Sequence, residues 1–182
     1  MLDRRTRVID AAIAIVGESG TRELTHRSID RRLGIPEGST SNYFRTRGAL
    51  LDAVVDRLAE LDRATLTDIH GGFENLDDAA LARGIAEYAV RLCRSGRITR
   101  TRARLVLTLT YPERLGGVLQ DWVRLGVENL GEHGSRDPEE VTKALLAYTD
   151  GTMLQAIVSS GGKGTELDRE RIAATVLLLL RG

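Results

Sequence analysis

The sequence has few of the residues that cross-link chains, bind metals or cross membranes. Its 182 residues include a single cysteine, Cys93, which excludes an internal disulfide and a cysteine-based metal site. No apolar run is long enough to cross a bilayer, and no apolar signal core follows the first residues. Only Lys143 and Lys163 are lysines among the 26 basic residues. We therefore expect a cytoplasmic protein with no metal, no cofactor and no membrane partner.

The sequence also lacks the patterns that common enzymes need. No histidine stands near an acid and a nucleophile at a spacing that would build a catalytic group. The segment 161–165 resembles a phosphate-binding loop superficially, but it lacks the preceding strand and the right glycine spacing. We expect a protein that is not an enzyme and has no catalytic residues.

The residues that are present are those of a folded globular chain with an uneven charge distribution. Hydrophobic residues make up 42% and charged residues 29%, which argues against disorder. The formal net charge is zero, yet residues 1–51 hold nine arginines against six acidic residues, and the remainder is acidic. This charge distribution, with a basic head and a mildly acidic body, indicates that the head binds a polyanion.

Helical periodicity dominates the sequence, and no stretch alternates with a period of two. We predict an all-α protein of about nine helices, with a head of residues 1–47 and a helical body of residues 48–182. The first helix should end before Gly20 and the fourth should begin near Arg47. The other expected helices cover 25–33, 36–44, 77–96, 98–110, 112–133, 138–160 and 166–181.

The segment from Thr25 to Arg47 reads as a helix, a tight turn and a second helix. Thr25 is a good N-terminal cap, and Gly34 can supply the positive φ that a sharp turn needs. Pro36 suits the first turn of the next helix, whose small residues 39–41 would allow close approach to another surface. The pattern predicts a helix-turn-helix whose second helix enters the major groove of DNA.

Residues 4–51 resemble the DNA-binding head of the TetR family of transcriptional regulators. The residues that carry the resemblance are Ile9, Ala11, Ala12, Gly20, Thr25, Ile29, Leu33, Gly34, Ile35, Gly38, Ser39, Tyr43, Phe44, Arg47, Leu50 and Leu51. The resemblance implies a homodimeric, ligand-responsive repressor that binds a pseudopalindromic double-stranded DNA operator. It further implies that an unknown small-molecule effector in the body changes the spacing of the two heads.

Two positions depart from the family pattern. Asp30 stands where the family usually has alanine, in the contact between the two helices, so it must turn to solvent or find a partner. That departure could loosen the helix crossing. Pro36 replaces a serine or threonine cap. These departures keep open an alternative interpretation, a helical interaction protein that has lost DNA binding.

The resemblance assigns DNA contacts residue by residue. Arg47 should bind a phosphate at the start of the fourth helix, and Asn42 could pair with an adenine edge. The full set of predicted DNA-binding residues is Thr25, His26, Arg27, Ser39, Thr40, Asn42, Tyr43 and Arg47. Alternatives remain for some of them: Tyr43 could pack in the core and Asn42 could be simply solvated. The arginines in residues 4–7 could form a solvated arm or reach the phosphate backbone.

The body should carry a ligand pocket and a dimer interface, as the resemblance implies. The predicted ligand-binding residues are Tyr88, Leu92, Leu109, Trp122, Thr149, Met153 and Gln155. The predicted dimer residues are Leu145, Tyr148, Thr152, Ala156, Ile172, Val176, Leu179 and Leu180. A second stripe on the same helix holds Ala144, Ala147, Gly151 and Leu154, and such a helix, apolar on two sides, should be buried on two sides. The alternative for either set is packing within one chain.

Overall fold

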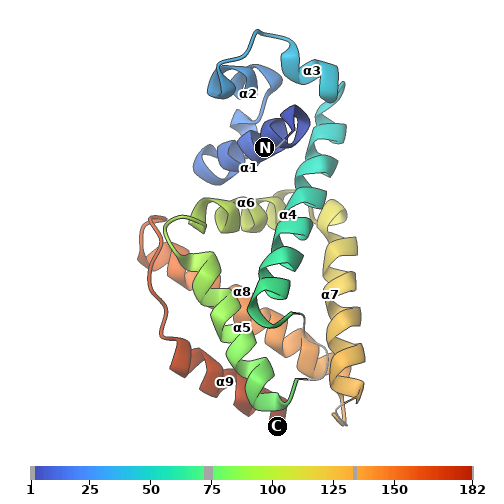
Figure 1. Ribbon diagram of the computed structural model, residues 1–182, viewed down its shortest axis with the longest axis vertical. Helices are drawn as coiled ribbons and strands as arrows, with labels where there is room; N and C mark the ends of the chain where they lie inside the picture. The colour runs from blue at the N-terminus through green and yellow to red at the C-terminus, as the bar shows by residue number, and fades with distance from the viewer. Residues whose placement is uncertain (1–2, 72–75, 133–134, 182) are drawn as a thin grey trace. The chain divides into compact units, whose positions relative to one another are not determined.

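The structure is a computed structural model that describes residues 3–71, 76–132 and 135–181. Every regular element in these residues is a helix, which confirms the predicted all-α class (Figure 1). The elements are α1 (Arg4–Ser19), the 3-10 turn η1 (Thr21–Glu23), α2 (His26–Leu33), α3 (Ser39–Tyr43), α4 (Arg47–His70), α5 (Asp78–Cys93), α6 (Ile98–Thr110), α7 (Pro112–Glu132), α8 (Pro138–Ser159) and α9 (Arg169–Arg181). None of the helices in these ranges is both long and apolar enough to span a membrane. His133 and Gly134, where α7 and the following turn were expected to meet, lie outside the described residues.

Most helix starts follow local signals that the sequence displays. Thr25, the predicted cap, accepts a hydrogen bond from the main-chain N–H three residues later at 3.0 Å. Asp77 and Asp137 accept in the same way, at 2.7 and 3.2 Å. Such caps satisfy one of the unpaired N–H groups at a helix start. The prediction for the last helix is wrong by three residues, because Asp168 accepts from the N–H of Arg171 and α9 begins after it.

The chain divides into two compact units, one formed by Met1–Leu61 with Thr99–Leu115 and the other by Asp62–Ile98 with Gly116–Gly182. The core of the first unit joins α1, α2, the first part of α4 and α6. Its fully buried members include Val8, Val16, Leu24, Ile29 and Leu107. This unit is larger than residues 1–47, because apolar residues from α4 and α6 complete its core. The functional boundary after residue 47 stays a prediction.

Within the first unit, α1 and α6 approach unusually closely at one glycine. A Cβ atom placed on Gly17 would lie 2.0 Å from the carbonyl oxygen of Thr99 and 2.8 Å from its Cγ2. Ordinary van der Waals contacts of a Cβ begin at 3.4 Å. Only glycine therefore allows the two main chains to pack at this distance.

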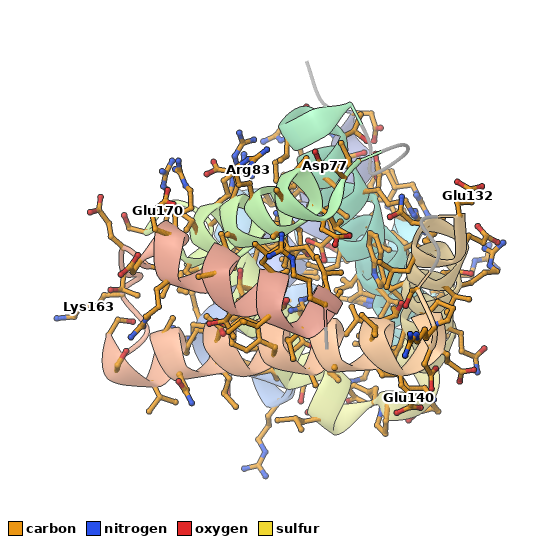
Figure 2. All side chains as sticks on the ribbon, turned by 90° about the horizontal axis from the view of Figure 1, so that it is seen from below. Asp77, Arg83, Glu132, Glu140, Lys163 and Glu170 are labelled. Atoms are coloured by element: carbon orange, nitrogen blue, oxygen red, sulfur yellow. The ribbon has the colours of Figure 1, made fainter. Side chains whose placement is uncertain are left out.

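In the second unit, α9 packs along α5 and α8 (Figure 2). The shared core includes Leu81, Ala86, Leu145, Ile172 and Val176. Figure 2 shows Glu170 at the start of α9 and Lys163 on the loop that precedes it. Glu87 of α5 ties α5 to α9, because its carboxylate pairs with Arg169 at 2.8 Å. The same carboxylate pairs with Arg91 of its own helix at 2.7 Å.

Candidate nucleic-acid interface

The first helix of the predicted motif, α2, is fixed at both ends. Thr25 and Ser28 form a reciprocal capping box, in which each side-chain oxygen accepts from the other residue's main-chain N–H at 3.0 Å. At the other end Gly34 adopts the left-handed conformation with φ of 64°. This confirms the predicted turn glycine.

The second helix, α3, is shorter than the sequence suggests. Gly38 has φ of 91°, a value that interrupts helical geometry, so α3 begins at Ser39. Pro36 therefore lies in the turn before the helix, and the expectation that it opens the helix is wrong. With five residues, α3 cannot be stable by itself and depends on its neighbours for its position.

Asp30 has found a partner, and it does not turn to solvent. Its side chain is buried, with 1% exposed, and accepts three hydrogen bonds from the turn and from α3. The main-chain N–H of Gly38 donates to Oδ2 at 2.8 Å, and that of Thr40 donates to Oδ1 at 2.9 Å. The Thr40 hydroxyl also donates to Oδ1, at 2.6 Å. The departure from the family pattern thus ties the two helices together.

These contacts also set the ionisation of the Asp30 carboxyl group. Burial by itself would raise its pKa. The hydrogen bonds from Thr40 and Gly38, together with the charge of His26, outweigh burial and hold the pKa below its usual range. Asp30 is therefore a carboxylate at neutral pH.

The residues of α3 divide into an inward and an outward face. Thr40 and, four residues later, Phe44, which directly follows the helix, are buried. The prediction that Thr40 binds DNA is therefore wrong for its side chain, which is 0% exposed and donates its hydroxyl proton to Asp30. Asn42 and Tyr43 are exposed, and Ser39 is half-buried beside them. Phe44 therefore packs in the core, and Tyr43 does not.

Three of the predicted DNA-binding residues gather around one hollow in the first unit. Thr25, His26 and Arg47 line it with Leu24 and Leu50, and its volume is about 220 Å³. The Arg47 guanidinium donates to the main-chain oxygens of Leu24 and Thr21, which holds it at the rim. The Nε2 atom of His26 is buried and has no hydrogen-bond partner among the described residues.

The other basic residues of the head differ in how free they are to bind a phosphate. Arg27 forms an exposed ion pair with Glu37 at 3.0 Å, which lowers the charge it can offer to a phosphate. The Arg5 guanidinium lies 5.0 Å from the centroid of the Phe44 ring, a cation–π contact that the sequence did not reveal. Arg4 and Arg7 are exposed, so both interpretations of this N-terminal cluster stay open.

Comparison with known proteins bears on this arrangement. A family profile described as the tetracyclin repressor-like C-terminal domain matches residues 76–182. The chain belongs to the TetR family of transcriptional regulators. This is a family of regulators rather than of enzymes.

Individual relatives agree with the family assignment. The regulator BetI of Escherichia coli O139:H28 (strain E24377A / ETEC) is 32% identical over 99 residues, which are 54% of this chain and 46% of BetI. The chain thus matches about half the length of this curated relative. Among solved structures, a TetR-family member from Streptomyces coelicolor A3 has 27% identity and a TM-score of 0.75, with 98% of each chain covered. The multidrug binding protein EbrR complexed with malachite green has 26% identity and a TM-score of 0.75, also with 98% of each chain covered.

The structure brings together some of the residues predicted for a TetR-type ligand pocket. Leu92 and Met153 are buried in one apolar cluster of the second unit, and Tyr88 packs against it. Thr149 is buried and donates its hydroxyl to the main-chain oxygen of Leu145 within α8. Trp122 is half-buried and Gln155 is exposed, and neither belongs to that cluster. Leu109 belongs to the first unit and is 82% exposed.

The predicted dimer residues largely serve the chain's own core. Leu145, Ile172 and Val176 are buried between α5, α8 and α9, and Ala156 is buried in the cluster with Met153. Tyr148, Leu179 and Leu180 pack partly against the same core, and Thr152 is half-buried with its hydroxyl donated to the oxygen of Tyr148. Leu145, Ala156, Ile172 and Val176 are therefore wrong as free interface residues, because intrachain packing already covers them.

The exposed apolar face of α8 and α9 lies elsewhere on these helices. Leu154 is 49% exposed, and Val158 and Leu178 are each 72% exposed. Ala144 and Ala147 are exposed in line with Leu154, and Ala174 is exposed one turn before Leu178. This set, Ala144, Ala147, Leu154, Val158, Ala174 and Leu178, is called the exposed stripe below. It contains most of the second stripe seen in the sequence.

Proposed function

We propose that this TetR-family protein is a homodimeric, ligand-responsive repressor that binds a pseudopalindromic operator in double-stranded DNA. The observation that carries the proposal is the outward face of α3, where Ser39, Asn42 and Tyr43 project from a helix fixed to α2. Beside it, Thr25, His26 and Arg47 surround one hollow. This arrangement is the one by which a helix-turn-helix binds DNA, because side chains of the second helix contact base edges and residues beside that helix bind phosphates. Such a regulator acts in the cytoplasm.

The main reason to suspect lost DNA binding is the departure at Asp30, and its contacts argue against that alternative. A carboxylate that accepts three hydrogen bonds strengthens the contact between α2 and α3. The alternative, an interaction protein without DNA binding, therefore loses one of its two motivating observations and keeps only the departure at Pro36. A direct binding measurement still separates the two.

The exposed stripe supports the homodimer. Leu154, Val158 and Leu178 are apolar residues on two adjacent helices, and small residues beside them allow a partner helix to approach closely. The two helices of a second copy would cover the stripe and form a four-helix interface. In a dimer with two-fold symmetry each stripe contacts its own counterpart.

The proposed effector site is the cluster of Tyr88, Leu92 and Met153. Ligand sites in proteins are mainly apolar with a few placed polar groups, and this cluster has that composition. The solved relative EbrR is a multidrug binding protein seen with malachite green and with ethidium. We propose that this chain likewise takes a small aromatic compound. Trp122, the only tryptophan, gives a fluorescence signal for titration with such dyes, and Met153→Ala should weaken the response.

Binding-site selection from a pool of randomised duplexes tests the DNA-binding proposal whatever the operator sequence is. The wild-type chain should enrich an inverted repeat whose half-sites lie about 10 base pairs apart. Fluorescence anisotropy should then show tight binding to the enriched duplex, weak binding to its shuffled form, and affinity that falls steeply with salt. No enrichment and no binding at low salt would favour the interaction protein instead.

The dimer is tested by charge insertion into the exposed stripe. Val158→Glu and Leu178→Glu should each yield monomers in sedimentation or mass photometry, because burying a carboxylate in an apolar interface is costly. Leu109→Glu is a matched control, since Leu109 is similarly exposed but belongs to the other unit. A dimer that survives both stripe variants would show that the interface lies elsewhere.

A further inference from the structure

We propose that Asp30 and Thr40 position the recognition helix α3, so that the sequence preference of this protein depends on a pair of residues that touch no base. The inference rests on the proposed function, because it concerns how α3 meets operator DNA. It assigns to Asp30 a positioning role that the family pattern, with alanine at this place, does not contain.

The hydrogen bonds of Asp30 fix both ends of the turn between α2 and α3. The main-chain oxygen of Asp30 accepts from the N–H of Ile35 at 3.0 Å, which closes α2. Its side chain accepts from Gly38 and Thr40, which opens α3. One residue thus joins the end of the first helix to the start of the second. Gly38 has no side chain that could cap α3, so the Asp30 carboxylate satisfies the N–H groups there.

The orientation of α3 follows from the inward face that the pair creates. Thr40 is held by Asp30, and Phe44, four residues later, is held in the apolar core. Two fixed points on one side of a helix this short determine the direction of its other side. Ser39, Asn42 and Tyr43 lie on that other side, at spacings of three and four residues.

The neighbouring hydroxyl groups add a second consequence for base reading. Ser39 donates its proton to the main-chain oxygen of Pro36, and Ser41 donates to that of Gly38, each at 2.6 Å. The hydroxyl oxygens of Ser39 and Ser41 have thus used their protons, so they can only accept a hydrogen bond from a base. Asn42, exposed on the same face, carries a side-chain amide that can both donate and accept. An adenine edge in the major groove matches it.

The pair requires two acceptor atoms on residue 30 and a donor on residue 40. Asp30→Asn has the same shape but places an amide N–H against a main-chain N–H. Thr40→Val also keeps the shape, and it removes only the hydroxyl donor. Thr40→Ser keeps the donor and loses a methyl group, so it is the matched control.

The test uses the full chain, the duplex enriched by wild type and its shuffled form. Thr40→Val and Asp30→Asn should each bind the enriched duplex about tenfold or more weakly, as the loss of a charge-assisted hydrogen bond implies. Binding to the shuffled duplex should change less than about twofold, because phosphate contacts dominate it. Thr40→Ser, which keeps the hydroxyl donor, should bind the two duplexes with the same preference as wild type. In Asp30→Asn, faster hydrogen exchange at the N–H of Gly38 should accompany the loss, because that N–H donates to Oδ2 of Asp30.

The outcomes separate the inference from the proposed function. If wild type enriches no sequence, both fail together. If wild type discriminates and the folded variants discriminate equally well, only the positioning role is overturned. An equal loss on both duplexes would assign Asp30 and Thr40 a purely structural role and would also overturn it. Should Asp30→Asn fail to fold, the comparison of Thr40→Val with Thr40→Ser decides the question.

Discussion

Replacing Gly17 by alanine should destabilise the protein, although alanine is the better helix former. Helix propensity alone favours alanine over glycine by about 1 kcal/mol in a helix interior. The added Cβ, however, would lie 2.0 Å from the carbonyl oxygen of Thr99, and no side-chain rotation can move a main-chain atom. Overpacking of this kind costs about 1–3 kcal/mol or more. We expect Gly17→Ala to lower the free energy of unfolding by about 1–2 kcal/mol, which is several degrees in Tm.

The assay is thermal and urea unfolding followed by circular dichroism, with a second glycine as the matched control. Gly117 lies on the exposed side of α7, and a Cβ there would meet nothing within 4 Å. Gly117→Ala should therefore raise the free energy of unfolding by up to about 1 kcal/mol. The two substitutions have opposite expected signs. If Gly17→Ala were as stable as wild type, α1 and α6 could not approach at this point as described.

Three further predictions concern the second unit and the DNA-facing surface. Gly126→Ala should lower Tm, because the new Cβ would lie 2.4 Å from Cγ2 of Thr142, and adding Thr142→Ala should restore most of the loss. Glu37→Gln releases Arg27 from its ion pair and should strengthen binding to shuffled duplex about two- to threefold at low salt, as measured by anisotropy. The lowered pKa of Asp30 means that its contribution to stability is present at neutral pH and is lost as the pH falls below about 4. In urea unfolding between pH 3 and 6, Asp30→Asn should therefore be less stable at pH 6 and should lose less on acidification.

Each of these has a result that would contradict it. A double variant as unstable as Gly126→Ala alone would mean that Thr142 is not the obstacle. If Glu37→Gln left binding unchanged at low salt, while Glu139→Gln on α8 served as the distant control, Arg27 would not contact phosphate. Parallel pH profiles for wild type and Asp30→Asn would place the acid-sensitive contribution on other carboxyl groups.

Features of this fold that depend on neighbouring residues in the sequence could be predicted from it. The caps at Thr25, Asp77 and Asp137 each need only a side-chain oxygen and an N–H three residues later. The left-handed turn at Gly34 is equally local. The end points that failed, Pro36 and residues 166–168, failed because another residue nearby offered a later start.

Features that depend on contacts between helices could be anticipated only in part. The sequence shows that Asp30 needs a partner, but not that Thr40, ten residues away, is that partner. On α8 the apolar residues run along two sides, and periodicity does not say which side meets α5 and α9. The side with Leu145 met them, leaving Leu154 and Val158 exposed. Which side of α8 is buried is therefore decided by its packing against other helices, and the sequence of α8 alone does not show this.

The core of the first unit also has a consequence for synthesis on the ribosome. The residues of the helix-turn-helix are made before those of α6, but Ala103 and Leu107 of α6 belong to the same core. About 60 residues separate Phe44 from Leu107, so at 5–20 residues per second the nascent head waits roughly 3–12 seconds for its last core residues. During that interval the apolar side chains that α6 will cover stay accessible to chaperones and to other nascent chains. The helix-turn-helix is thus translated well before the core that supports it is complete.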